Sequence, residues 1–95
     1  MFKKLEEILN MYEGGQGALG EKIIVEYLAN KPKNAIDDFC VSVAAIKKAG
    51  HCELWQKQML RDFFKEIQRV EKYRNLFLRT QYCEEIRDYM YFKIL

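Results

Sequence analysis

Residues 54–72, LWQKQMLRDFFKEIQRVEK, carry apolar and charged side chains with the period of an α-helix. At about 100° per residue, most of the apolar side chains fall within an arc of roughly 120°, and Leu60 and Phe64 widen this arc to about 180°. That arc holds Trp55, Met59, Leu60, Phe63, Phe64, Ile67 and Val70. A helix with so wide an apolar face has to bury it against other elements. The segment is therefore predicted to anchor a helical bundle.

The opposite side of this predicted helix is basic and holds Lys57, Arg61, Lys65, Arg69 and Lys72. The first four follow one another at i, i+4, so each lies one helical turn, roughly 5 to 6 Å, from the next. Like charges at this spacing repel by about 0.2 to 0.5 kcal/mol per pair. A solvated surface is the ordinary explanation of a charged helix face, and a binding surface is the alternative that we keep for this row.

Positive charge is concentrated in the middle of the chain. Residues 1–46 hold five Lys and seven Asp or Glu, residues 47–79 hold nine Lys or Arg and four acids, and residues 80–95 hold two and three. The net charge of the chain is only +2, which excludes a polycation of the histone or ribosomal kind. The asymmetry fits contact with phosphates or with an acidic protein surface, and it also fits internal pairing between the ends and the centre.

Three further helices are predicted before this segment. Apolar residues at helical spacing from Phe2 to Tyr12 predict the first, and the glycines of residues 14–17 end it. The second is expected over about residues 18–29, with Leu19, Ile23, Ile24, Tyr27 and Leu28 on its buried side.

Proline disfavours helical geometry in the residue before it, so the second helix is expected to stop before Pro32. Asn34 is predicted as the N-cap of the third helix, and Gly50 as the C′ residue that ends it.

The C-terminal part, residues 53–95, has no Gly or Pro, which leaves open one helix of about forty residues. A second apolar stripe there is formed by Leu78, Tyr82, Ile86, Tyr89 and Met90. Its centre is rotated by roughly 120° from that of the first stripe, so both cannot face one core along a straight axis. A break or sharp kink is therefore predicted within residues 72–77.

These elements predict an all-α fold, a small single-domain bundle of four to five helices over residues 1–95. A hydrophobic fraction of 49% with 32% charged residues is typical of globular domains. Glu6 and Glu7 lie where a targeting segment needs an apolar core, and the apolar runs are too short to span a bilayer. Three cysteines without paired spacing fit a reducing compartment, so we expect a cytoplasmic protein.

The predicted last helix has more aromatic surface than one face can hide. Phe77, Tyr91 and Phe92 fall off its main stripe. Surplus large apolar side chains are typical of a contact surface, for a partner or for a second copy in a homodimer. The same surplus also fits a terminal helix that is held from two sides within a small bundle.

The sequence has no spacing that indicates catalysis or metal binding. Zinc needs about four ligands, whereas His51, adjacent to Cys52, is the one histidine of the chain. The glycines of residues 14–17 lack the preceding strand and the GK[ST] ending of a phosphate-binding loop. We therefore expect no enzyme activity, no metal and no cofactor.

Two binding functions remain ahead of an enzyme. The first is a small non-enzymatic intracellular protein that binds another macromolecule and modulates or inhibits it, as immunity proteins, phage anti-defence inhibitors and anti-sigma-like regulators do. Its expected partner is a protein, with an acidic surface suited to the basic helix face. The alternative is a helical nucleic-acid-binding protein or subunit that lays the stripe from Lys57 to Lys72 along phosphates, with the salt dependence this implies.

Overall fold

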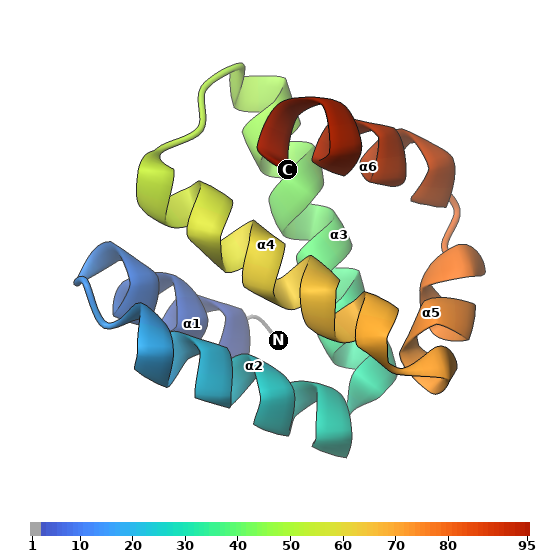
Figure 1. Ribbon diagram of the computed structural model, residues 1–95, viewed down its shortest axis with the longest axis horizontal. Helices are drawn as coiled ribbons and strands as arrows, with labels where there is room; N and C mark the ends of the chain where they lie inside the picture. The colour runs from blue at the N-terminus through green and yellow to red at the C-terminus, as the bar shows by residue number, and fades with distance from the viewer. Residues whose placement is uncertain (1–2) are drawn as a thin grey trace.

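The computed structural model describes residues 3–95, and this part of the chain consists of helices and the turns that join them (Figure 1). Its elements are α1 Lys3–Glu13, α2 Gly17–Asn30, α3 Pro32–Ala49, α4 Leu54–Arg69, α5 Glu71–Leu78, α6 Cys83–Tyr89 and a π-helical turn, η1 Met90–Ile94. The predicted all-α class is confirmed, although six α-helices and a π-turn replace the four to five helices expected. Phe2, expected in the first apolar set, lies outside the described residues.

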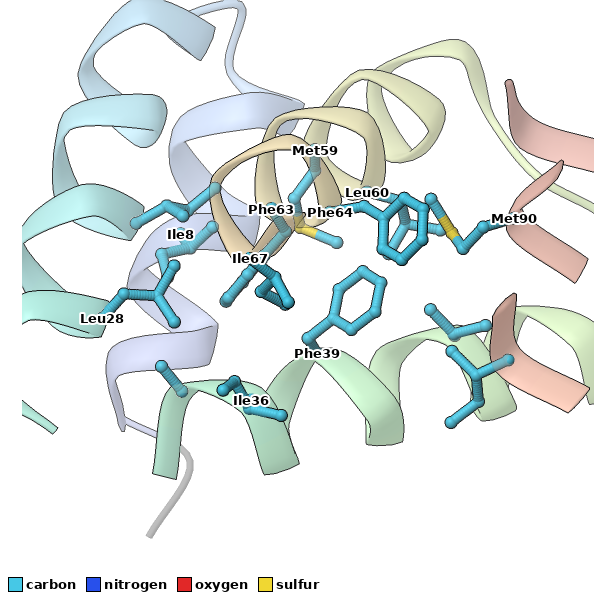
Figure 2. Packing of buried hydrophobic residues seen from close by; sticks show 14 of the residues in the cluster. Ile8, Leu28, Ile36, Phe39, Met59, Leu60, Phe63, Phe64, Ile67 and Met90 are labelled. Atoms are coloured by element: carbon cyan, nitrogen blue, oxygen red, sulfur yellow. The ribbon is translucent and has the colours of Figure 1, made fainter. Parts of the chain in front are cut away.

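Helix α4 lies in the middle of the bundle and packs against α1, α2, α3, α5 and η1. In Figure 1 it crosses the view between the α1–α2 pair and α6, with α3 behind it. Five of its predicted core residues are buried, namely Met59, Leu60, Phe63, Phe64 and Ile67. The ring of Phe39 on α3 lies against those of Phe63 and Phe64, with centroids 5.5 and 5.8 Å apart (Figure 2). The apolar face of this helix therefore forms the centre of the core.

Local sequence signals fix both sides of the turn between α3 and α4. Gly50 ends α3 with φ 71°, and its N–H donates to the Ile46 carbonyl, as the C′ prediction requires. Glu53 and Gln56 form a capping box at the start of α4, in which the Glu53 N–H donates to Gln56 Oε1 at 2.7 Å. These two devices satisfy backbone groups that the helix ends would otherwise leave unpaired.

The hairpin of α1 and α2 is closed by a tight glycine contact. Gly15 turns the chain with φ 80°, a conformation that side chains other than glycine rarely adopt. A Cβ added to Gly20 would lie 2.5 Å from the Tyr12 ring, so the two helices approach closely only because Gly20 has no side chain. Leu19, expected on the buried side of α2, is instead exposed.

Helix α3 begins three residues earlier than predicted. Pro32 occupies its first turn and Lys31 is the N-cap, so the expectation that Asn34 caps this helix is wrong. Proline suits this position because its fixed φ is helical and because its missing N–H would have no intrahelical partner there.

Two breaks interrupt residues 53–95, and neither lies where it was predicted. The first is at Val70, whose extended backbone (φ −110°, ψ 121°) separates α4 from α5, so α5 runs straight through residues 72–77. The second spans residues 79–82, where the Thr80 hydroxyl donates to the Phe77 carbonyl at 2.7 Å. The reversals let Ile67 and Phe77, on different helices, reach the same core.

The second apolar stripe was predicted only in part. Ile86 and Met90 are buried, whereas Leu78, just before the second break, and Tyr82, within it, are exposed. The closing π-turn places Ile94 in the core as well, and the Leu95 N–H donates to the Met90 carbonyl at 2.8 Å. None of the helices between residues 3 and 95 combines the length and apolar composition that a bilayer crossing requires.

Candidate functional site

Four of the five predicted cations lie on one continuous helix, and the fifth does not. Lys57, Arg61, Lys65 and Arg69 belong to α4, while Lys72 follows the break at Val70 and lies on α5. The chain changes direction at this break, so Lys72 does not continue the row. The helical segment predicted over residues 54–72 is thus three residues too long, and the candidate surface is the outer face of α4.

Both acids of α4 accept hydrogen bonds from other side chains, one from α1 and one from within α4. Asp62 accepts a hydrogen bond of 2.6 Å from the hydroxyl of Tyr12 on α1. Glu66 accepts two bonds from Arg69, to its two carboxylate oxygens, at 2.9 and 2.7 Å. These bonds hold the pKa of Glu66 below its usual range, because they stabilise its charged form. Arg69 is therefore neutralised by its own helix, and Asp62 is held toward α1.

The remaining cations of the row have no ion-pair partner among the described residues; they are Lys57, Arg61 and Lys65. Arg61 is exposed, and its Nε donates to the Ile94 carbonyl at 3.0 Å, which fixes the end of η1 against α4. Lys65 is exposed and Lys57 is partly buried. The outer face of α4 thus presents three cations that the rest of the described chain leaves uncompensated.

The predicted aromatic interface is only partly on the surface. Phe77 is 3% exposed and packs edge-on against the rings of Phe39 and Phe64, so its assignment to an interface is wrong. Tyr91 is 52% exposed and Phe92 is 81% exposed. Phe77 is buried although it lies off the predicted stripe, because the chain changes direction at the breaks on both sides of α5 and so buries this side of the helix. Self-association through Tyr91 and Phe92 stays a prediction.

A cleft opens where the C-terminal end of α4 meets α5, α6 and η1. Its volume is about 240 Å³, and it is lined by Ile67, Gln68, Arg74, Phe77, Leu78, Arg87 and Tyr91. The Arg74 Nη1 donates to the Gln68 carbonyl at 2.7 Å, and Gln68 Nε2 donates to the Tyr91 hydroxyl at 3.4 Å. Two arginines and Tyr91 therefore line the cleft above an apolar floor that includes Ile67 and Phe77.

Sequence reasoning did not connect Arg74 with Arg87, because thirteen positions and the second break separate them. One available signal was the surplus of charged and aromatic residues that the apolar stripes did not use. Gln68 was a second available signal, because it lies one helical turn after Lys65 and therefore extends the polar face of α4 toward the cleft. The pairing itself depends on how α6 packs back toward α4.

The pair His51 and Cys52 lies in the turn before α4. His51 Nε2 is 2.7 Å from Glu53 Oε1 on the exposed surface, and burial raises the pKa of the Cys52 thiol. Residues 3–95 contain no group of three or more His, Cys, Asp or Glu side chains placed to hold a metal ion. The expected lack of enzyme activity, metal and cofactor stays a prediction.

Comparisons with protein-family models, with curated proteins and with solved structures find no match for this chain.

Proposed function

We propose that this protein acts without catalysis, by binding an acidic surface of another protein through the outer face of α4 and thereby modulating or inhibiting that partner. The proposal depends on one observation: the acids of α4 are paired, whereas most of its cations are not paired within the described part of the chain. Its two acids are held by Tyr12 and Arg69, while Lys57, Arg61 and Lys65 have no ion-pair partner among the described residues. A row of like charges costs stability, and a complementary partner surface removes that cost.

The composition of the neighbouring surface supports a protein partner over a nucleic acid. Tyr91 and Phe92 are exposed on η1, which packs against α4, and aromatic side chains and arginine are enriched at protein interfaces. The row on α4 spans about 18 Å from Lys57 to Arg69 at 1.5 Å per residue, and one of its four cations is already paired. A DNA-binding protein that makes about six to ten phosphate contacts uses more cations than this face supplies.

Site-specific photo-crosslinking tests the proposal, because it captures a bound partner whatever its identity. A photoreactive residue at Lys65 is compared with one at Lys22, which is exposed on α2, in extract of the native host. We expect a protein adduct from position 65 that is absent from position 22. Adducts with nucleic acid instead of protein would favour the phosphate-binding alternative, and equal adducts from both positions would overturn the proposed surface.

Charge reversal supplies the matched control. The variant Lys57→Glu, Arg61→Glu, Lys65→Glu is expected to lose the adduct, because it turns an attractive surface into a repulsive one. The variant Lys22→Glu, Lys31→Glu, Lys48→Glu changes the net charge equally at exposed positions away from α4 and is expected to keep it. Binding to single- and double-stranded DNA over a salt series completes the comparison, and no salt-dependent affinity is expected.

A further inference from the structure

The cleft between α4, α5 and α6 has the size of a side-chain site. Its volume of about 240 Å³ is below the roughly 300 to 1,000 Å³ of sites for drug-sized ligands. At about 30 Å³ per water molecule, it corresponds to roughly eight waters. A cleft of this size accommodates one large side chain.

The lining of the cleft is apolar at its base and basic at its sides. Ile67 and Phe77 are buried core residues, so the part of each that reaches the cleft forms a fixed apolar floor. Leu78 and Tyr91 are exposed at the rim. A lone oxyanion would leave this apolar surface unused, and a purely apolar ligand would leave the two arginines unpaired.

The two arginines are prepared for an anion in different ways. Arg74 is held by the bond from its Nη1 to the Gln68 carbonyl, so part of the entropy cost of positioning its guanidinium is already met by the fold. Arg87 is partly buried, and neither arginine has an ion-pair partner among the described residues. No acidic residue belongs to the described lining of the cleft. Planar guanidinium groups bind carboxylates in paired hydrogen bonds.

The second groove of similar size differs in charge. It lies between α3 and α6, has a volume of about 300 Å³, and includes Val41 and Tyr82. Its Lys47 is 3.9 Å from Glu85, which lines the same groove, so the positive charge there is compensated. An acidic ligand has reason to choose the first cleft and not this one.

The cleft also continues the candidate surface. Gln68 lies one helical turn after Lys65 on the same side of α4, so the cationic row leads directly to the cleft mouth. We propose that this cleft receives one hydrophobic side chain of an acidic protein segment, while carboxylates on either side of that side chain pair with Arg74 and Arg87. This inference rests on the proposed function, from which it takes the partner class, and adds the chemistry of the recognised segment.

Short peptides test the inference directly. The probe is acetyl-Glu-Glu-Phe-Glu-Glu-amide, titrated to roughly 1 mM while backbone amide shifts are followed by NMR. We expect the shifts to concentrate at residues 67–68, 74–78 and 87–91, and alanine at the centre of the peptide to weaken binding at least tenfold. Shifts centred on the groove at Val41 and Tyr82, or no shifts at all, would overturn the inference.

Matched arginine variants separate specific pairing from general attraction. Arg87→Gln is expected to weaken the peptide about fivefold, equivalent to about 1 kcal/mol for one exposed or partly exposed ion pair. Arg79→Gln removes the same charge from the end of α5, outside the cleft lining, and is expected to change affinity less than twofold. Equal weakening by both variants would reduce the effect to net charge and reject the site. Displacement of the peptide by inorganic phosphate or pentathymidylate at lower concentration would reassign the cleft to phosphate groups.

The native partner distinguishes failure of the cleft from failure of the proposed function. If charge reversal on α4 abolishes the crosslinked partner while Arg87→Gln leaves its affinity unchanged, the cleft inference is wrong and the proposed function stands. If neither change affects the partner, both are wrong. Loss of affinity with Arg87→Gln but not with Arg79→Gln, at unchanged thermal stability, supports the cleft.

Discussion

The two flanks of α4 are built from similar residue types but end in different states. On one flank α1 and α2 pack against the helix, and Tyr12, 3% exposed, donates a 2.6 Å hydrogen bond to Asp62. On the other flank η1 leaves a cleft, and Tyr91, half exposed, accepts a bond of 3.4 Å from Gln68, which is longer than a typical N–H···O bond. The first flank, which we call the closed flank, uses its polar groups to hold the fold. The second, the open flank, leaves its polar groups accessible.

The comparison shows that similar residue types can serve either stability or binding. Both flanks combine an aromatic ring with a polar residue of α4, so residue type alone does not mark a binding site. What distinguishes the open flank is that its arginines have no ion-pair partner among the described residues, whereas Asp62 on the closed flank is held by Tyr12. Mutations on the closed flank should therefore change stability, and those on the open flank should change binding.

The largest contrast is expected from truncating the two tyrosines. Tyr12→Ala removes a buried ring and leaves Asp62 without its partner, so the free energy of unfolding should fall by about 3 to 5 kcal/mol. Tyr91→Ala removes a half-exposed ring and should cost less than about 1 kcal/mol. Urea unfolding followed by circular dichroism measures both. Equal losses would show that the open flank is as important to the fold as the closed one.

Gly20 tests how tightly the closed flank is packed. Gly20→Ala places a Cβ 2.5 Å from the Tyr12 ring and should destabilise the protein by about 1 to 3 kcal/mol, despite the better helix propensity of alanine. Gly17→Ala is the matched control, because its Cβ meets the same ring at an ordinary 3.4 Å. It should be neutral or slightly stabilising in thermal unfolding. A stabilised Gly20→Ala protein would mean that the ring can move aside freely.

Alkaline pH should weaken the packing of α1 against α4 and of α2 against α3, because a buried tyrosine donates a hydrogen bond across each contact. Burial, with the hydrogen bond to Asp38, raises the pKa of Tyr27 to about 12, and burial and Asp62 raise the pKa of Tyr12 further in the same direction. Both tyrosines ionise near pH 10 in the unfolded chain. Their stabilising effect is therefore complete below pH 10 and is lost as the pH rises toward the folded values, by about 1 kcal/mol at pH 11 for Tyr27 alone.

Unfolding in urea from pH 8 to pH 11 checks this dependence. Tyr27→Phe should be less stable than the wild type at pH 8, because Asp38 loses its donor, and should show a shallower decline above pH 10. An identical decline in both proteins would assign the alkaline effect to other groups.

Arg61 gives a smaller effect, confined to the open flank. Arg61→Gln removes the hydrogen bond to the Ile94 carbonyl and should lower stability by about 0.5 to 1.5 kcal/mol. Amide exchange at the end of η1 should quicken, whereas exchange in α1 and α2 should scale only with global stability. Lys65→Gln, which removes a charge from the same face without a bond to η1, is the control. Faster exchange at η1 in both variants would exclude the Arg61 bond as its cause.

Phe92 should show the smallest effect on the fold. Phe92→Ser changes a side chain that is 81% exposed, so its stability should stay within about 0.5 kcal/mol of the wild type. Light scattering over a concentration series then reports whether Phe92 holds two copies together. An unchanged monomer would discard self-association through this residue and leave the open flank free for a different protein.

The parts of the fold that local sequence signals determine were predictable. The apolar face of α4 followed from its helical period, and Gly50 followed from the need for a left-handed C′ residue. The breaks at Val70 and at residues 79–82 were not, because they arise from distant packing that brings Ile67 and Phe77 to the same core. Thr80 was an available signal, since its hydroxyl can bond to a carbonyl three residues earlier and end a helix.

The candidate site likewise has parts that could be predicted from the sequence and parts that could not. The row of Lys57, Arg61 and Lys65 could be placed on one face from spacing alone. The neutralisation of Arg69 was within reach, since Glu66 lies three residues before it, but the geometry had to decide between pairing and repulsion. The cleft needed Arg74 and Arg87 to converge from two helices, which no local pattern encodes.

The central position of α4 has a consequence for how the protein unfolds. Because α1, α2, α3, α5 and η1 all rest on this one helix, removing it would expose an apolar face on each of them. The amides of α4 should therefore exchange with solvent only through global unfolding, and those of the terminal turn η1 should open earlier. We therefore expect the helices that pack on α4 to unfold together with it, so a partner bound to α4 would also protect helices that it does not touch.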